Sequence, residues 1–265
     1  MWASVPRMGI GQRWEGEDPT RTLAFLGHGV DFVEPNLPLD LDGLLARGVP
    51  LITHSSEVAV ASTGALNEEM VATLAEQIHR ARPPWTGEHF ALLTREVTGN
   101  LGYNAAPILD EATIDAGVAH ARALEDRYGC PIALEAGPRY LEIGGWDDYG
   151  AILRVSERTG CGILIDLSHH LVSMRNLGRD PQDGLTGAVL ERTVEIHVTG
   201  VGRHRDGRHY HDCHGRPVPE DVWSLLAWVT PQAPNLKAVT LEHDATVADD
   251  AYAADLARLR AMLRL

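Results

Sequence analysis

The sequence predicts an α/β fold, a (β/α)8 barrel of the TIM type that forms a single domain over residues 1–265. Short apolar, β-rich runs alternate with longer stretches of helical spacing, which is typical of a parallel sheet covered by helices. There are eight such runs, and 265 residues is a normal length for one barrel. Glu135, Asp166 and His197 are separated by 31 residues in two successive steps, about the length of one βαβ repeat.

The eight expected strands are short runs rich in apolar and β-branched residues, most of which end on a polar residue. They are Val5–Ile10, Val30–Glu34, Pro50–His54, Trp85–His89, Ile132–Glu135, Gly162–Asp166, Val194–Val198 and Ala238–Glu242. The expected helices lie between them, at Leu39–Arg47, Asn67–Ala81, Asp110–Tyr128, Asp147–Thr159, Glu220–Val229 and Ala248–Leu263. Acidic first turns favour the starts of two of these helices, at Asn67 and Asp110. Glycines are expected where helices end, at Gly129, Gly160 and Gly178.

Composition excludes several classes of protein. The chain carries 23 basic and 37 acidic residues, a net charge of −14, which argues against nucleic acid as a partner. The apolar runs are too short and interrupted to span a membrane, and residues 1–14 lack the continuous apolar core of a signal peptide. Three scattered cysteines, Cys130, Cys161 and Cys213, are too few for a disulfide framework. We therefore expect a cytoplasmic protein.

The ends of the expected strands carry residues that bind metals or transfer protons. In a barrel of this type all strand C-termini open on one face, which hosts the active site. The residues at those ends are Glu34, His54, His89, Glu135, Asp166, His197 and Glu242. Carboxylates and imidazoles packed together without a cation would repel one another or lose solvation at substantial cost. The sequence therefore predicts a metal site at the mouth of the barrel.

The stretch from Val194 to His214 extends this set. It contains five of the thirteen histidines and closes on Asp212-Cys213-His214. By itself it could also be a solvated, histidine-rich surface loop. Together with the strand ends it gives nine candidate ligands, enough for two or three ions: His54, His89, Glu135, Asp166, His169, His197, Asp212, His214 and Glu242. Nitrogen and oxygen donors without a thiolate suit iron, manganese or zinc.

Other histidines and neighbours of the ligands are expected to be structural. His28, His79 and His120 lie in helical or loop stretches, and His204, His209 and His211 are expected in a loop, although His211 is close enough to assist Asp212. Strand alternation turns Cys213 and His243 away from the site, so we do not expect a cysteine nucleophile. One of His169 and His170 is expected to be a ligand, and the other to face outward or to cap the next helix. Asp244 could return to the site.

The motifs resemble one known family over nearly the whole chain and in the same order. They are H-S-S at His54, G-E-H-F at 87–90, L-E-A-G-P-R-Y at 134–140, G-C-G-I-L-I-D-L-S-H-H at 160–170, E-I-H-V-T-G at 195–200, H-D-C-H-G-R-P-V-P-E-D-V-W at 211–223 and T-L-E-H-D at 240–244. These resemble the DUF692 family of multinuclear non-heme iron-dependent oxidative enzymes, related to the methanobactin-biosynthesis oxidase. The resemblance implies a TIM-type barrel with two or three iron ions and dioxygen as co-substrate. It also implies a ribosomally made precursor peptide, often with a partner protein that delivers it.

Two positions depart from the pattern of that family. The family commonly reads E-N where this chain has Glu135-Ala136, and D-x-N-N where this chain has Asp166-Leu167-Ser168-His169. His169 therefore stands in place of an asparagine ligand, which keeps a donor but changes its chemistry.

The leading functional hypothesis is an iron-dependent oxidase or oxygenase that modifies a peptide side chain, cysteine in the first instance, with dioxygen. The alternatives are a divalent-metal-dependent isomerase or hydrolase of the xylose-isomerase-like class, and a catalytically silent subunit that only binds a peptide or partner. We expect the loop Thr94–Pro107, through Asn104, and the residues Arg139 and Tyr140 to line the substrate path.

Overall fold

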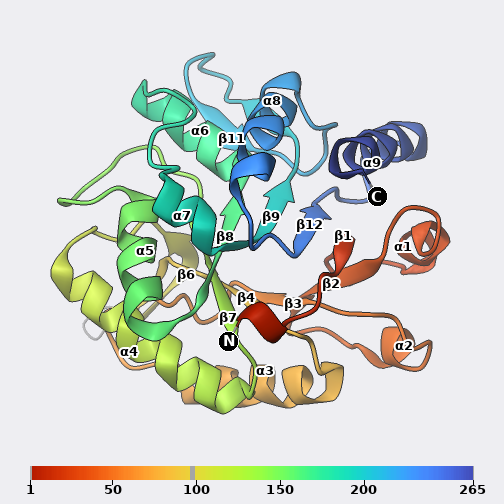
Figure 1. Cartoon of the computed structure of the whole chain (residues 1–265). Helices are drawn as coiled ribbons and strands as arrows, with labels where there is room; N and C mark the ends of the chain where they lie inside the picture. The colour runs from red at the N-terminus through yellow and green to blue at the C-terminus, as the bar shows by residue number, and fades with distance from the viewer. Residues whose placement is uncertain (1, 96–98, 265) are drawn as a thin grey trace.

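A computed structural model describes residues 2–95 and 99–264 and confirms the predicted barrel (Figure 1). Eight parallel strands close on themselves in the order β1-β12-β9-β8-β7-β4-β3-β2, so that each barrel strand pairs with its neighbours in sequence. The strands are β1 (Gly9–Trp14), β2 (Phe32–Leu37), β3 (Thr53–Ser55), β4 (Thr86–His89), β7 (Ile132–Glu135), β8 (Gly162–Asp166), β9 (Thr193–Val198) and β12 (Ala238–Leu241). Their C-terminal ends share one face, and this places the predicted ligands together.

Helices surround the barrel. They are α1 (Thr20–Phe25), α2 (Asp42–Leu45), α3 (Glu68–Ala81), α4 (Glu111–Tyr128), α5 (Asp148–Thr159), α6 (Leu167–Leu177), α7 (Gly187–Arg192), α8 (Glu220–Val229) and α9 (Asp249–Leu263), with 3-10 turns η1 (Trp2–Ser4) and η2 (Thr230–Gln232). Side chains of Asn67, Asp110 and Asp147 accept backbone hydrogen bonds at the starts of α3, α4 and α5. The predicted helix ends at Gly129, Gly160 and Gly178 are confirmed, each with a left-handed backbone.

The prediction for the first strand was wrong by four residues. Val5–Ile10 was expected, but the strand is Gly9–Trp14. Val5 and Met8 instead pack, with Trp2, against a cluster that fills the N-terminal end of the barrel, made of Phe32, Ile52, Trp85, Ala133, Leu164, Val194 and Ala238. The apolar residues of this segment cover the floor of the barrel, so the strand starts later. The shift places Arg13 near the C-terminal end of β1, inside the mouth.

Three helices were not predicted: α1, α6 and α7. The helix α6 begins immediately after β8, because one carboxylate oxygen of Asp166 accepts hydrogen bonds from the backbone N–H groups of Ser168 and His169. The polar residues Ser168, His169 and His170 interrupt the apolar periodicity by which helices are predicted, so the sequence did not predict this one. The aspartate before the first turn and the glycine at 178 were the available signals.

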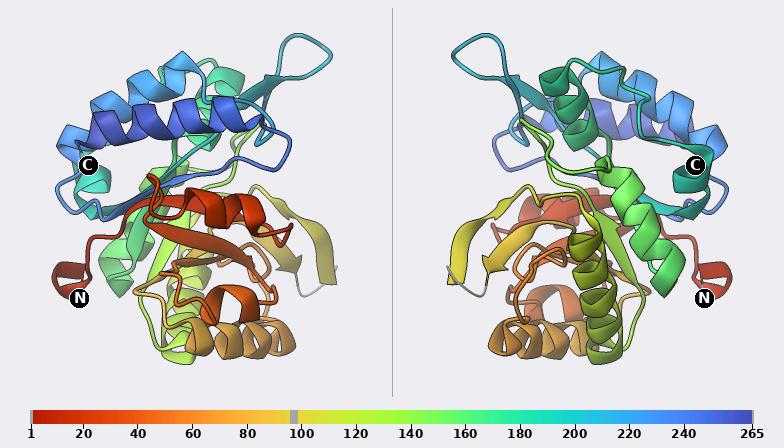
Figure 2. Two further views of the ribbon diagram at one scale, coloured as in Figure 1. Left: turned by 90° about the vertical axis from the view of Figure 1, so that its right-hand side faces the viewer. Right: turned by 90° about the vertical axis from the view of Figure 1, so that its left-hand side faces the viewer.

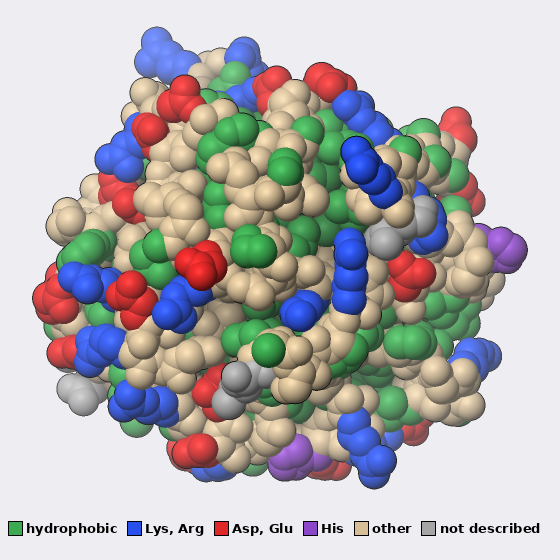
Figure 3. Space-filling model, in the orientation of Figure 1, with side chains coloured by type: hydrophobic (Ala, Val, Ile, Leu, Met, Phe, Trp, Pro, Cys, Tyr) green, Lys and Arg blue, Asp and Glu red, His purple; other side chains and the backbone are tan. Residues whose placement is uncertain are grey.

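Two antiparallel hairpins project from the same end of the molecule (Figure 2): β5 (Leu92–Arg95) with β6 (Gly99–Ala105), and β10 (Val201–Arg203) with β11 (Tyr210–Asp212). The expected loop Thr94–Pro107 is thus largely a hairpin, and residues 96–98 of that prediction lie outside the described residues. Acidic and basic side chains are interspersed over the face shown in Figure 3. Within residues 2–95 and 99–264, no helix combines the length and the apolar character needed to cross a membrane.

Candidate metal centre

Glu135, at the end of β7, lies between three imidazoles. Its Oε2 is 2.7 Å from His54 Nε2 and 3.4 Å from His89 Nε2, and its Oε1 is 2.9 Å from His169 Nδ1. His54 and His89 come from the neighbouring strands β3 and β4, and their rings meet edge to face with centroids 5.0 Å apart. Glu135 is 1 % exposed. Two groups of possible ligand atoms therefore share this carboxylate: His54 with His89, and His169 with Asp166.

Asp166 performs two tasks with its two oxygens. Oδ1 caps α6, while Oδ2 faces His169 Nε2 at 3.7 Å and has no hydrogen-bond partner within the described part of the chain. Because α6 starts at Leu167, His169 lies in its first turn and faces the mouth of the barrel. The helix that the sequence analysis missed is therefore what positions His169.

Asp212 and His214 reach the cluster from the hairpin β10–β11 and the loop after it. His214 Nε2 lies 2.8 Å from Asp212 Oδ2 and 3.7 Å from Glu242 Oε2. His169 Nε2 is 3.6 Å from Asp212 Oδ2, so this group adjoins the one around Glu135. His169, Asp212 and His214 form a further trio whose ligand atoms all lie within 4.8 Å of one another.

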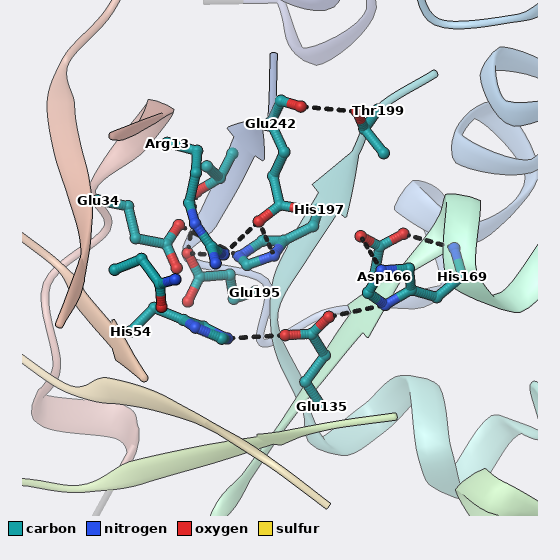
Figure 4. Close-up of polar contacts among 12 residues, drawn as sticks. Arg13, Glu34, His54, Glu135, Asp166, His169, Glu195, His197, Thr199 and Glu242 are labelled. Carbon is teal, nitrogen blue, oxygen red and sulfur yellow. Dashed lines mark hydrogen bonds and ion pairs between the residues drawn. The ribbon is translucent and has the colours of Figure 1, made fainter. Parts of the chain in front are cut away.

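His197 occupies the interior of the barrel on the other side. Its Nδ1 lies 3.1 Å from Glu242 Oε1, and its Nε2 lies 3.2 Å from Glu34 Oε2 and 3.7 Å from Glu195 Oε1. Trios that can hold an ion are formed by His197 with Asp166 and Glu242, and by His197 with Glu34 and Glu195. Figure 4 shows these side chains converging from separate strands.

The sequence did not identify two residues on this side of the barrel, Glu195 and Arg13. Glu34 was predicted at a strand end but was not counted among the candidate ligands. Glu195 is fully buried, with its oxygens held by the Trp85 indole at 2.6 Å and the Thr240 hydroxyl at 3.1 Å. Arg13 is 7 % exposed and ion-paired with Glu242 and Glu15. Alternation along β9 from His197 could have identified Glu195, whereas the misplaced first strand concealed Arg13.

The cluster has the properties of a site built for cations. Several buried polar atoms lack a hydrogen-bond partner within the described residues: both oxygens of Glu34, Nδ1 of His54 and of His89, Oδ2 of Asp166, both ring nitrogens of His197, and Oδ1 of Asp212. Buried polar atoms are normally satisfied, so a concentration of such exceptions marks the cluster as a candidate cation site. Imidazole and carboxylate donors fit a divalent first-row metal.

Burial and mutual charge shift the pKa values of these groups. Burial lowers the pKa of His89 to about 3, which keeps its ring neutral and free to donate a lone pair at neutral pH. Burial, with the negative charges of Glu242 and Asp212, raises the pKa of Asp166 to about 8. Burial opposes the charged form of His214, but the hydrogen bond to Asp212 and the charge of Glu242 raise its pKa to about 9. Protons thus occupy positions that a cation would take.

A cavity of about 300 Å³ opens beside the cluster. His89, His169 and Asp212 form one wall, and all three predicted substrate residues, Asn104, Arg139 and Tyr140, contribute to the others. Tyr140 is 47 % exposed.

The Arg139 guanidinium is not available as a free charge in this cavity. It is buried, ion-paired with Asp148, and donates a hydrogen bond to the carbonyl of Pro107 at 3.3 Å. Asn104 donates to the carbonyl of Ser56 at 3.0 Å. Arg139 therefore shapes the wall of the cavity.

The remaining histidines lie outside the cluster. The structure corrects two expectations in this region, one for His170 and one for Asp244. His170 was expected to face outward or to cap the next helix, but it is buried and contacts the carbonyl of Pro181 at 2.9 Å, because α6 packs that side against the loop at 181. The Asp244 carboxylate accepts hydrogen bonds from the backbone N–H and the hydroxyl of Thr246, and Asp244 belongs to none of the ligand trios among the described residues, contrary to the expectation that it returns to the site. His243 turns away and contacts Asp255 at 2.8 Å.

Solved structures of other barrels share this fold. A xylose isomerase domain protein from Planctomyces limnophilus aligns with a TM-score of 0.61 at 13% sequence identity, over 98% of this chain and 96% of that one. Endonuclease IV from Thermus thermophilus aligns with a TM-score of 0.59 at 18% identity, over 98% of this chain and 99% of that one. Identities this low establish the architecture alone.

Sequence comparison goes further. A UPF0276 protein of Anaeromyxobacter sp. (strain Fw109-5) is 30% identical over 197 residues, covering 72% of this chain and 67% of the relative. A UPF0276 protein of Caulobacter vibrioides is 27% identical over 215 residues, covering 74% and 73%. The family model described as "RiPP precursor modification enzyme MbnB/TglH/ChrH" matches residues 35–264, which confirms the resemblance seen in the motifs. The chain therefore belongs to this family of enzymes that modify ribosomally synthesised precursor peptides.

Proposed function

We propose that this chain is a multinuclear iron-dependent oxidase or oxygenase that uses dioxygen to modify a side chain, cysteine in the first instance, of a ribosomally synthesised precursor peptide. The proposal joins the family of the chain to the arrangement of ligands at the mouth of the barrel.

The observation that carries the proposal is that the carboxylates are shared. Glu135 belongs to two trios, with His54 and His89 on one side and with Asp166 and His169 on the other. Asp166 belongs to a second trio as well, with His197 and Glu242. A carboxylate with two oxygens can bridge neighbouring cations, and such bridging is what separates a multinuclear centre from a single ion with three or four ligands.

The donor set is compatible with iron. The trios contain only imidazole and carboxylate, which suit iron and manganese, both able to change oxidation state, and also zinc, which is not. When bound, iron would supply one-electron chemistry with dioxygen and would lower the pKa of a coordinated substrate thiol. The protein contributes neutral His89, a buried Glu135 and a fixed His169, all oriented before any ion arrives.

The surroundings of the cavity favour a peptide as substrate. Its walls include apolar groups such as Phe90, Ala91 and Pro138, which exclude water from the reacting side chain. The large hydrophobic side chains that the described residues expose are Tyr103, Ile108, Tyr140, Leu141 and Ile143. They lie on segments that flank this cavity, and we name them the apolar rim. Exposed hydrophobic side chains on segments beside a cavity favour a binding surface, so we assign the apolar rim to the precursor, alone or delivered by a partner protein.

The test combines metal analysis with detection of the modified peptide. The protein is loaded anaerobically with ferrous iron, and a Cys-bearing peptide encoded beside its gene is co-expressed and analysed by mass spectrometry. Glu135→Gln should lose bound metal and all modification, because it removes the charge shared by two trios. Glu88→Gln is the matched control: Glu88 is equally buried, but its carboxylate accepts from Tyr128 rather than facing the cluster.

Oxygen uptake separates the proposal from its rival. A peptide oxidase consumes dioxygen when iron and peptide are both present, whereas an isomerase or hydrolase of the same fold consumes none. Full zinc occupancy with less than about one iron per chain, or a mass change without oxygen uptake, would contradict the proposal.

A further inference from the structure

The tip of the β10–β11 hairpin carries an unusual concentration of unpaired positive charge. Residues 203–209 are all exposed and include Arg203, Arg205 and Arg208. Within the described part of the chain, the side chains of Arg205 and Arg208 contact no hydrogen-bonding or ionic partner. The guanidinium of Arg203 lies over the ring of Tyr210, 4.9 Å from its centroid, and binds its hydroxyl, but no carboxylate. In a chain with a net charge of −14, this is a local reversal of sign.

The one acidic residue of the tip is engaged within the hairpin. Asp206 accepts hydrogen bonds from the backbone N–H groups of Arg208 and His209, and its Oδ2 lies 2.6 Å from His209 Nδ1. It therefore shapes the turn, and its carboxylate faces His209 rather than the arginines. Some exposed arginines elsewhere pair with carboxylates, such as Arg258 with Glu220 and Arg158 with Asp115, but the hairpin tip gathers several that do not within a few residues.

The hairpin connects directly to the candidate metal centre and to its cavity. Its second strand ends at Asp212, which lies in the cluster and in the cavity wall. Asn176 of α6 anchors this strand through its side-chain amide, which bonds the N–H and the carbonyl of Tyr210 at 2.8 and 3.0 Å. At the tip, His204 contacts the hydroxyl of Tyr140, another cavity residue, at 3.1 Å. In Figure 2 the hairpin projects beyond the body of the molecule, so its tip is accessible.

We infer that the hairpin is the docking site for an acidic segment of the peptide substrate, an inference that rests on the proposed function. Guanidinium groups without internal partners bind carboxylates with charge-assisted hydrogen bonds. From Arg208 to Asp212 the chain advances by four residues, at most about 13 Å at roughly 3.3 Å per extended residue. The acidic segment therefore lies about four or more extended residues from the side chain that is modified. Binding at the tip raises the local concentration of that side chain at the cavity.

Peptide binding by two charge-reversed variants tests the inference. The probe is fluorescein-labelled hexaglutamate, measured by fluorescence anisotropy with metal-loaded full-length protein, with hexalysine as the opposite-charge probe. Arg205→Glu/Arg208→Glu should weaken hexaglutamate binding about tenfold or more, and added salt should weaken binding to the wild type. The matched control, Arg47→Glu/Arg82→Glu, changes the net charge equally at exposed residues that follow α2 and α3 and should bind like the wild type.

The inference is wrong if the wild type does not bind hexaglutamate, or if both variants lose the same share of hexaglutamate affinity. It is also wrong if an oligothymidylate of about twelve nucleotides binds the wild type more tightly than hexaglutamate does, which would make the hairpin a nucleic-acid surface. Circular dichroism verifies that both variants are folded. The two proposals fail separately. A protein that binds hexaglutamate but neither retains iron nor consumes oxygen contradicts only the proposed oxidase. Oxidation of the peptide by the Arg205→Glu/Arg208→Glu variant at the wild-type KM contradicts only the docking site.

Discussion

At the scale of single residues, Arg13 acts as a permanent cation among carboxylates. It is buried, pairs with Glu242, and feels the charges of Glu15, Glu34 and Glu135, which together raise its pKa above the ordinary value despite its burial. A buried arginine cannot discharge itself, so it offsets part of the repulsion in the cluster whether or not metal is bound. It also holds one oxygen of Glu242 in place.

Arg13→Gln should therefore destabilise the metal-free protein by about 3–5 kcal/mol, since it removes a buried positive charge from among several buried carboxylates. Urea denaturation measures this change. Arg258→Gln, which breaks the exposed pair with Glu220, should cost only about 0–1 kcal/mol. Equal losses in the two variants would show that Arg13 has no special role in balancing the cluster.

The raised pKa of His214 predicts that thermal stability changes with pH in opposite directions with and without metal. The pKa of His214 is raised from its ordinary 6.5 to about 9, so its ion pair stabilises the metal-free fold fully below pH 6.5, and this stability is lost as pH rises through 9. Metal must displace the same proton, so metal affinity should increase over that interval. Thermal unfolding from pH 6.5 to 9 should show a falling Tm without metal and a rising one with it. His214→Gln should flatten both slopes; unchanged slopes would contradict the assignment.

At the scale of elements, the short strands position ligands through close contacts with their neighbours. Gly87 on β4 pairs with His54 on β3, and a Cβ atom at position 87 would lie 2.3 Å from Cδ2 of His54. The absence of a side chain at Gly87 therefore makes room for the His54 ring beside Glu135. The helix α6 positions a ligand in a different way, because its N-terminal cap, Asp166 at the end of β8, is itself a candidate ligand.

Gly87→Ala should displace the His54 ring, lower metal affinity about tenfold and destabilise the fold by about 1–3 kcal/mol. Isothermal titration with Mn²⁺ measures the affinity. Gly187→Ala is the control, because a Cβ atom there meets nothing within 4 Å and Gly187 is the first residue of α7. Unchanged affinity in Gly87→Ala would mean that His54 does not bind metal.

At the scale of the whole molecule, a cation is expected to join the two sides of the barrel. The candidate ligands come from strands spread around the closed sheet. The trio of Asp166, His197 and Glu242 alone joins β8, β9 and the residue after β12, so one ion would cross-link segments far apart in sequence. Binding that occurs only in the folded state stabilises that state by mass action.

Ferrous or manganous ion at about 100 times its Kd should stabilise the protein by about 2.7 kcal/mol. For a chain of this size that corresponds to a rise in Tm of roughly 5–10 °C. Thermal unfolding under anaerobic conditions measures the shift, and a chelator should reverse it. A Tm that stays constant over the whole range of metal concentrations would contradict metal binding by the folded chain.

The sequence alone determined the barrel and the residues gathered at its mouth. Strand ends at Glu135, Asp166 and His197 recur at the βαβ period, and parallel strands can close only with their C-terminal ends on one side. Local signals at Asp110, Gly129 and Gly160 were sufficient to place helix ends, because capping depends on nearby residues.

Only the tertiary structure decided how those residues are connected. The position of Arg13 depends on where β1 begins, which is fixed when the sheet closes and the N-terminal segment covers its floor. The sharing of Glu135 between three imidazoles likewise depends on distances between strands rather than along them. Spacing along a chain specifies which residues reach the mouth of the barrel, whereas packing across it specifies which atoms meet.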